Sequence, residues 1–237
     1  MVLKNKKASL DKASQGSLMQ RLLDIVFSGI AMVILSPILL PIAGVLKVTG
    51  EGEIFYTQPR VGQYGKKFGL IKFATMLKNS PSLGTGDVTI KDDPRVLPVG
   101  KLLRKSKINE LPQLWNIFCG DMSVVGPRPM VPKTYEKYPV WAQETLNSVR
   151  PGLTGIGSIV FRDEERLLDG LDDPLKFYDE HITPHKSKLE VWFVENNSLS
   201  LYLQVIVVTA WVVMFPSSTI VDKVFAGLPA LPRHLRS

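Results

Sequence analysis

The longest apolar stretch of the chain covers residues 22–46, and after Asp24 it carries no charge until Lys47. That is about the length a helix needs to cross the hydrocarbon core of a bilayer. A signal peptide is a poorer interpretation, because the apolar core is too long and no small-residue cleavage site follows it. The pattern predicts a membrane helix over residues 22–48, preceded by a flexible basic tail over residues 1–21.

Ser36 and Pro37 interrupt this stretch near its middle. Proline removes a helix N–H and clashes with the preceding turn, so we expect a break there. A serine hydroxyl can bond a carbonyl that the proline leaves free, which lets such a break persist in lipid. The ordinary alternative is a kinked helix that spans the membrane. Basic residues lie on both flanks, however, and the positive-inside preference favours a re-entrant helix that leaves on the side it entered.

Shorter patterns predict a small sheet surrounded by helices. Residues 54–58 and 68–73 have the composition of strands, joined by a glycine-containing turn at residues 61–67. Helical patterns begin at Val99 and again at Tyr135. The expected fold class is therefore α/β, mostly helical with a small sheet.

A second apolar run covers residues 199–215, but it is short for a span and contains Gln204 and Thr209. We expect this helix to lie in or just under the membrane interface. The organisation that follows is a cytoplasmic catalytic domain with interfacial helices over residues 49–215, and an irregular C-terminal tail over residues 216–237.

The candidate chemistry is concentrated between residues 102 and 129. Arg128 stands between Pro127 and Pro129, which fix its backbone and deny it a helix. A stiffly mounted arginine suits a phosphate, because its planar fork loses little freedom on binding. Glu110 is a candidate metal ligand or nucleophile. The pattern favours chemistry on a phosphate ester, and spacing alone leaves ordinary structural ion pairs as an equal alternative.

Composition narrows the class of partner. The net charge is +7, with 29 Lys and Arg against 22 Asp and Glu. A basic surface fits nucleic acid, an anionic membrane or phosphate substrates. The chain lacks an interleaved aromatic and basic pattern, so we expect no nucleic-acid partner. The single cysteine, Cys119, excludes an intramolecular disulfide.

The central stretch resembles the signature of the bacterial sugar transferases, also called monotopic phosphoglycosyl transferases. The resemblance extends from about residue 20 to about residue 215. Its marks, in chain order, are Ser36-Pro37, Arg60-Val61-Gly62, Lys72-Phe73-Ala74-Thr75-Met76, residues 104–129, Arg150-Pro151-Gly152-Leu153-Thr154-Gly155 and Trp192-Phe193-Val194-Glu195-Asn196.

The resemblance implies an enzyme on the cytoplasmic face of the bacterial inner membrane. Such an enzyme moves a phosphosugar from a nucleotide diphosphate sugar, here a UDP-sugar, onto a polyprenyl phosphate such as undecaprenyl phosphate, with Mg²⁺ as cofactor. It releases a nucleoside monophosphate and starts polysaccharide or glycoconjugate assembly. The implied architecture is monotopic, with a re-entrant helix in contact with membrane lipids and a homodimer as a possible assembly.

The family pattern carries over to particular residues. Arg104 and Arg128 match positions that grip phosphate. Glu110 matches the glutamate of the family's reactive pair and is a candidate Mg²⁺ ligand. Lys72 would reach a phosphate if it lies beside Glu110. Relatives usually carry arginine where this chain has Ala74, which removes any phosphate role there.

Two further segments are expected near the sugar or nucleotide. Arg150 and Thr154 match the family pattern within a glycine-rich turn. Arg162, Asp163 and Glu164 look like a subgroup feature near the sugar or nucleotide. The alternative for them is a helix start, where acidic side chains are favoured.

This chain departs from the family at its reactive pair, which is Asn109-Glu110 where relatives carry Asp-Glu. An amide is a poor nucleophile and a weaker Mg²⁺ ligand than a carboxylate. Three hypotheses stay open. Glu110 is the nucleophile, or Glu110 holds Mg²⁺ while the lipid phosphate attacks directly, or the protein is a catalytically silent scaffold of the glycan assembly machinery.

Overall fold

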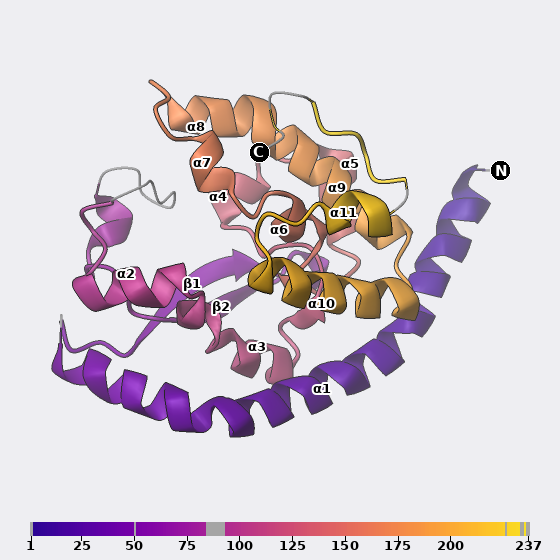
Figure 1. Cartoon of the computed structure of the whole chain (residues 1–237). Coiled ribbons are helices and arrows are strands. Elements are labelled where there is room, and N and C mark those ends of the chain that lie inside the picture. The colour runs from indigo at the N-terminus through magenta and orange to yellow at the C-terminus, as the bar shows by residue number, and fades with distance from the viewer. Residues whose placement is uncertain (1, 50, 84–92, 226, 233–234, 236–237) are drawn as a thin grey trace.

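The computed structural model describes every residue except 1, 50, 84–92, 226, 233–234 and 236–237. The described chain is mostly helical, with two small sheets (Figure 1). The helices are α1 (Val2–Val48), α2 (Pro98–Lys105), α3 (Gln113–Cys119), α4 (Pro132–Tyr135), α5 (Val140–Leu146), α6 (Ile156–Val160), α7 (Glu164–Leu167), α8 (Pro174–Phe177), α9 (Thr183–Glu195), α10 (Leu199–Met214) and α11 (Ile220–Val224). The strands are β1 (Phe55–Val61), β2 (Lys67–Phe73), β3 (Ser123–Val125) and β4 (Gly152–Thr154), and the short 3₁₀ and π turns are η1 (Gln63–Gly65), η2 (Ser80–Ser82), η3 (Ile108–Glu110) and η4 (Tyr178–Ile182).

Helix α1 differs from its prediction in two ways. It begins at Val2, whereas a membrane helix was expected only from residue 22. It also stays helical through Ser36 and Pro37, so the expected break does not interrupt it. The Ser36 hydroxyl donates a 2.8 Å hydrogen bond to the Val33 carbonyl. Because proline has no N–H to offer that carbonyl, the serine side chain replaces the missing backbone bond and the helix continues.

Helix α1 lies along the rest of the molecule as a curved arc, with α3 directly above it (Figure 1). Near its middle, the Arg21 guanidinium donates to the Phe118 carbonyl at 2.7 Å. Near its C-terminal end, Leu46 is buried in a small core with Phe73 and Leu103. The helix therefore contacts the globular domain from Arg21 to Leu46, at positions far apart in its sequence.

Asp24 forms the main polar connection between α1 and the domain. Its side chain is only 1% exposed, and its Oδ1 accepts three hydrogen bonds. The donors are the Ser123 hydroxyl at 3.0 Å, the Val124 N–H at 2.8 Å and the Tyr202 hydroxyl at 2.8 Å. One carboxylate thus joins α1, β3 and α10, and its hydrogen bonds offset the cost of burying a charge.

Strands β1 and β2 form the predicted antiparallel hairpin, with Phe55 opposite Phe73 and Val61 opposite Lys67. The hairpin is fastened to α3 by the Asn116 side chain, which accepts from the Ile71 N–H at 3.0 Å and donates to the Gly69 carbonyl at 2.8 Å. These two hydrogen bonds fix the position of β2, which carries Lys72, relative to α3.

Strands β3 and β4 form a second, parallel pair that the sequence pattern did not predict. The pairing brings the Gly126–Arg128 segment against the glycine-rich turn that follows Arg150. Gly126 N–H donates to the Thr154 carbonyl at 2.9 Å. A Cβ on Gly152 would lie 2.1 Å from the Gly126 nitrogen, so only glycine permits this approach.

Two further expectations are corrected. The helix predicted to begin at Tyr135 begins instead at Val140 as α5, with Pro139 as its N-cap residue, and α4 ends at Tyr135. The tail after Pro216 contains α11, and its Val221 and Phe225 are buried in the main core. The apolar side of that short helix explains why the segment packs against the domain.

Candidate active site

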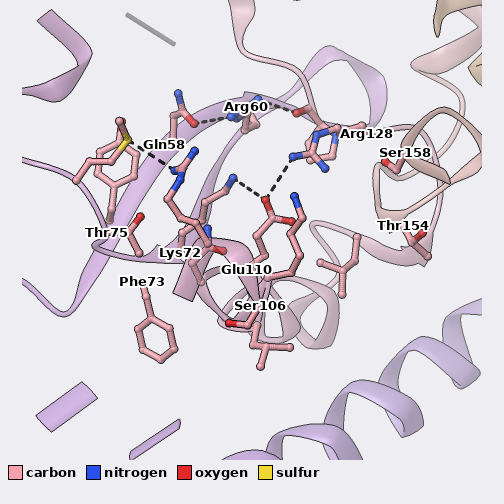
Figure 2. A pocket seen from close by; sticks show the side chains of 18 of the residues that line it. Gln58, Arg60, Lys72, Phe73, Thr75, Ser106, Glu110, Arg128, Thr154 and Ser158 are labelled. Atoms are coloured by element: carbon pink, nitrogen blue, oxygen red, sulfur yellow. Dashed lines mark hydrogen bonds and ion pairs between the residues drawn. The ribbon is translucent and has the colours of Figure 1, made fainter. Parts of the chain in front are cut away.

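A cavity of about 1330 Å³ lies between the β1–β2 hairpin, α2, η3 and the helices α6, α7, α9 and α10. Pockets that hold a drug-sized ligand measure roughly 300–1,000 Å³, so this cavity is larger than a typical ligand pocket. Most of the predicted site residues line it, and Figure 2 shows the part around Glu110. They are Lys72, Arg104, Asn109, Glu110, Arg128, Thr154, Arg162, Asp163 and Glu164.

Glu110 is the centre of the polar part of the cavity. Its Oε1 lies 3.2 Å from the Lys72 Nζ and 3.3 Å from the Arg128 Nη2. The two cations reach the carboxylate from different elements (Figure 2). The Glu110 and Lys72 side chains are 18% and 17% exposed, whereas that of Arg128 is 44% exposed. Lys72 therefore lies beside Glu110, which was the condition for its phosphate role, and Arg128 keeps open surface toward the cavity.

Local backbone structure presents each of these side chains. Glu110 ends the 3₁₀ turn η3, which follows Lys107, a non-glycine residue in the left-handed region with φ 58°. Such backbone strain costs about 1–3 kcal/mol and is found most often at functional sites. Arg128 is mounted between two prolines, and the Arg60 side chain donates to the Pro129 carbonyl at 2.9 Å. The backbone that carries Arg128 is thus held in place by a side chain of β1.

The charges of Glu110, Lys72 and Arg128 shift one another's pKa values. Burial alone would raise the pKa of the Glu110 carboxyl, but the charges of Arg128 and Lys72 outweigh it and hold that pKa well below its usual range. Burial lowers the pKa of the Lys72 amine to about 8, although Glu110 opposes the shift. At neutral pH Glu110 is ionised and Lys72 is still mostly protonated.

Asn109 and Arg104 complete the group on this side of the cavity. Asn109 is 5% exposed, and its side-chain oxygen has no hydrogen-bond partner among the described residues. Arg104 lies at the end of α2, with Nη1 3.7 Å from the Met76 sulfur. An unsatisfied buried amide oxygen next to the carboxylate is an acceptor that a substrate or water could use.

The residues present fit a Mg²⁺ ion only if substrate supplies most of the ligands. The described part of the chain contains no group of three or more His, Cys, Asp or Glu side chains that could hold a metal. One carboxylate with phosphate oxygens and water is nevertheless the usual arrangement for Mg²⁺. Glu110, with the unpartnered Asn109 oxygen beside it, matches that arrangement.

The residues predicted near the sugar or nucleotide separate into two sets. Thr154, Asp163 and Glu164 line the cavity, and the Thr154 hydroxyl lies 2.8 Å from that of Thr209. Arg162 lines it too, but its guanidinium donates to the Pro216 carbonyl. This contact holds the segment after α10 in place. Arg150 lies outside the lining and donates to the Gly120 carbonyl at 2.9 Å. Its part in the molecule is to hold the turn after α3.

Sequence reasoning missed a second polar group, carried by α9. Lys186 and Glu190 are 6% and 3% exposed, and both line the cavity. The Lys186 amine contacts the Glu164 carboxylate and lies 3.1 Å from the Tyr178 hydroxyl. Oppositely charged residues four apart, on a helix with apolar neighbours, were the available signal.

Glu190 is connected to the Glu110, Lys72 and Arg128 group by a hydrogen bond from the Arg128 backbone. Its Oε1 accepts from the Arg128 N–H at 3.3 Å, and its Oε2 has no partner in the described part of the chain. Burial raises the pKa of the Glu190 carboxyl to about 7. Arg128 is therefore shared, with its guanidinium at Glu110 and its peptide N–H at Glu190.

Comparisons with known proteins identify the family of the chain. The sequence profile of a family described as "Bacterial sugar transferase" matches residues 15–216. The exopolysaccharide production protein ExoY of Sinorhizobium fredii is 39% identical over 163 residues, which are 63% of this chain and 72% of that protein.

Two longer relatives are named as transferases. The UDP-glucose:undecaprenyl-phosphate glucose-1-phosphate transferase of Klebsiella pneumoniae is 37% identical over 67% of this chain. The undecaprenyl-phosphate galactose phosphotransferase of Salmonella typhimurium is 32% identical over 83% of this chain. The matched regions are 34% and 40% of those two proteins, so the chain corresponds to less than half of each.

Proposed function

The chain belongs to the bacterial sugar transferase family, and on that premise we propose that it transfers a phosphosugar from a UDP-sugar to undecaprenyl phosphate and releases UMP. The observation that carries the proposal is the contact of one ionised carboxylate, Glu110, with Lys72 and Arg128 at the wall of a large cavity. A diphosphate donor brings negative charge that must be neutralised, and two fixed cations meet that need.

The acceptor would reach this cavity from the membrane. Leu46, at the end of α1, lines the cavity, and so does Phe55, which is 53% exposed and stacked on Phe73 at 5.6 Å. An apolar rim beside the membrane helix suits a lipid whose phosphate must lie at Glu110 while its chain stays in the bilayer. Lipid headgroups would contact the same edge of the protein.

We propose that α1 is re-entrant, with both flanks on the cytoplasmic face of the bacterial inner membrane. Among the described residues one helical segment, Leu18–Val48, is long and apolar enough to cross a membrane. Asp24 and Leu46 are separated by roughly 33 Å of helix at ~1.5 Å per residue, yet both are buried against the same domain. A helix crossing the bilayer would carry one of them to the opposite surface.

The side of α1 that faces away from the domain supports the same disposition. Val33, Ile34 and Leu40 are 74%, 67% and 71% exposed, and Trp115 and Phe118 of the adjacent α3 are exposed too. Water would penalise such a continuous apolar face, whereas a lipid leaflet would cover it. The domain would then rest on the membrane through α1 and α3.

The chemistry requires substitution at the sugar-bearing phosphorus. A P–O bond forms to the attacking oxygen, and the phosphoanhydride bond to UMP breaks. Arg128 and Lys72 would hold the diphosphate in line and neutralise charge that gathers on the leaving UMP. A Mg²⁺ ion bound by Glu110 and the phosphate oxygens would neutralise further charge.

Two routes use this geometry. In the first, the Glu110 carboxylate attacks and carries the phosphosugar until the undecaprenyl phosphate takes it. In the second, an oxygen of the undecaprenyl phosphate attacks directly, Glu110 would hold Mg²⁺, and the arginines would position the donor. The lowered pKa of Glu110 supports both routes, because each needs the ionised carboxylate.

The test is turnover by the purified protein in lipid nanodiscs with Mg²⁺, undecaprenyl phosphate and a panel of UDP-glucose, UDP-galactose and UDP-N-acetylgalactosamine. UMP is the expected product. Release of UDP would indicate an ordinary glycosyl transferase and contradict the proposal. We propose that this product starts the assembly of a polysaccharide or glycoconjugate, which a membrane extract supplied with further nucleotide sugars would extend.

One observation favours a second candidate, a catalytically silent scaffold for glycan assembly. Asn109 stands where the family resemblance implies an aspartate, and a buried amide is a poor nucleophile. Failure to turn over any donor, together with co-purification of other membrane transferases, would support the scaffold. The intact contacts of Glu110 make the enzyme the better hypothesis. A homodimer, if formed, would be detected by the mass of the nanodisc-embedded protein.

A further inference from the structure

Glu190 poses an energetic problem that the transfer chemistry does not solve. The residue is 3% exposed, and one of its two carboxylate oxygens lacks a hydrogen-bond partner among the described residues. Leaving a buried acceptor unpaired is costly, so such groups usually have a further partner. The side chain lies at the wall of the cavity, where a bound molecule is the available partner.

The surroundings of Glu190 are built to keep this carboxylate in place. A Cβ on Gly157 would lie 2.3 Å from the Glu190 Oε1, so the glycine leaves the space that the carboxylate occupies. The Ser158 hydroxyl, one residue later, is likewise buried and has no hydrogen-bond partner in the described structure. Two unpartnered oxygen atoms thus lie on neighbouring parts of one wall, from α9 and α6.

The rest of this wall combines aromatic rings with fixed charge. Phe161 and Tyr178 line it, and the Lys186 amine lies 5.6 Å and 5.2 Å from their ring centres. Tyr138 is buried beside them and also lines the cavity. Aromatic faces with hydrogen-bonding groups between them suit a ring that is apolar on its faces and carries hydroxyl groups at its edge.

The position of this wall selects which part of the donor it meets. Arg128 contacts Glu110 through its guanidinium and Glu190 through its backbone N–H. The two carboxylates are therefore separated by the length of one arginine residue. In a nucleotide sugar the hexose is bonded directly to the phosphate that is attacked, whereas the nucleobase is separated from it by a second phosphate and a ribose. The nearer group is the hexose.

We propose that the Glu190 carboxylate and the Ser158 hydroxyl bind hydroxyl groups of the donor hexose and thereby determine which sugar the enzyme accepts. The inference rests on the proposed function, since it needs a nucleotide-sugar donor at Glu110. Turning the Glu190 carboxylate toward the cavity requires rotation about its last side-chain torsion, which has a broad energy profile in glutamate. Because burial raises the pKa of Glu190 to about 7, the group both accepts and donates at neutral pH, as sugar hydroxyls do.

The experiment is calorimetric titration of the full chain in nanodiscs with Mg²⁺ and without acceptor. The probes are UDP, the UDP-hexose that binds best, and its 2-, 3-, 4- and 6-deoxy analogues. We expect wild type to bind at least one deoxy analogue about tenfold or more weakly than the UDP-hexose, because the missing sugar hydroxyl leaves a buried polar group of the protein unpaired. Equal binding of all four analogues would overturn the proposal without any variant.

Glu190→Gln supplies the second arm. The amide keeps an oxygen for the Arg128 N–H but removes the carboxylate, so discrimination against the sensitive deoxy analogue should fall to within about twofold. Binding of UDP should not change. Equal weakening of UDP and UDP-hexose would mean that Glu190 holds the nucleoside or supports the Arg128 loop, and would overturn the proposal.

Controls separate this inference from the proposed function. Glu180→Gln makes the same chemical change at an exposed position just before α9 and should leave every affinity unchanged. Ser158→Ala should weaken the UDP-hexose and spare UDP, and it serves if Glu190→Gln does not fold. Failure of wild type to bind UDP itself would refute the proposed function, whereas UDP binding with no effect of any sugar hydroxyl would refute only the hexose site.

Discussion

The Tyr202 hydroxyl on α10 donates a 2.8 Å hydrogen bond to Oδ1 of Asp24 on α1, across 178 residues of sequence. The same oxygen accepts from Ser123 and Val124, so a single carboxylate joins the first helix to the domain. Helix α1 is consequently part of the folded domain and not a detachable segment.

Removing this carboxylate should destabilise the whole protein. Asp24→Ala leaves three buried donors unpaired, and we expect a loss of at least about 3 kcal/mol in the free energy of unfolding. Tyr202→Phe removes one donor and should cost about 1 kcal/mol. Urea unfolding in detergent measures both. Tyr64→Phe, at a side chain that is 71% exposed, is the matched control, and equal effects at Tyr64 and Tyr202 would contradict the role of the junction.

Arg128→Lys should not be a mild change. Lysine keeps the charge but loses the planar fork that can hold two phosphate oxygens. Release of UMP should fall at least about tenfold, which corresponds to one lost charged hydrogen bond. Arg166→Lys, on the exposed side of α7, should behave as wild type. Near-normal activity of Arg128→Lys would assign Arg128 a structural role.

The alkaline limb of the pH profile should belong to Lys72. Its pKa is lowered to about 8, so its charge is present below that pH and is lost as pH rises through it. The donor kcat/KM should therefore decline above pH 8. Lys72→Arg keeps the charge and should move the decline to higher pH, while Lys67→Arg on the same strand should not. A limb that stays in place in Lys72→Arg must come from another group.

Glu110→Gln should abolish turnover on either chemical route. The amide has the size of the carboxylate but cannot attack, and it offers Lys72 and Arg128 no charge. Asn109→Ala should leave some activity, because an amide at most positions a phosphate oxygen. If Glu110→Gln retains wild-type activity, the chemistry must be sought elsewhere, first at Asp163 and Glu164.

Asn109→Asp restores the pair that relatives carry and separates the two routes. With donor alone, this variant should trap a phosphosugar on residue 109, visible as added intact mass. An adduct on Glu110 in wild type would establish Glu110 as the nucleophile. Full wild-type turnover with no adduct would establish direct transfer.

The path of α1 through the membrane should depend on Ser36 and Pro37. Replacing them by Leu and Ala restores a backbone N–H and should straighten the helix until one flank crosses the bilayer. A Ser9→Cys reporter in a Cys119→Ser background, labelled from outside intact cells, measures it. The parent should be labelled only after lysis, and labelling of the parent from outside would contradict the re-entrant path.

Sequence patterns predicted the elements whose signal is local. The apolar run of α1, the β1–β2 hairpin and the helix of residues 199–214 are all present. The β3–β4 pair was missed because three-residue strands joined across a long separation leave no periodic pattern. The start of α1 was predicted 20 residues too late. The break expected at Pro37 is absent because the Ser36 hydroxyl bonds the carbonyl that the proline leaves free.

The candidate site divides in the same way. Glu110, Arg128 and Asn109 could be identified because they fall within one short stretch. Lys186 and Glu190 come from a distant helix, and their burial depends on how α9 packs, which no local pattern states. Arg150 shows the converse error, since a residue that matched a family pattern holds a turn through the Gly120 carbonyl.

The Asp24 junction also sets an order of events during synthesis. The ribosome makes α1 well before α10, which carries Tyr202. Until then the Asp24 carboxylate lacks one of its three donors and is best kept hydrated, which holds that end of the helix at the membrane surface. The nascent chain should therefore wait with α1 lying flat in the headgroup region, and the final docking of α10 should be the step that completes folding.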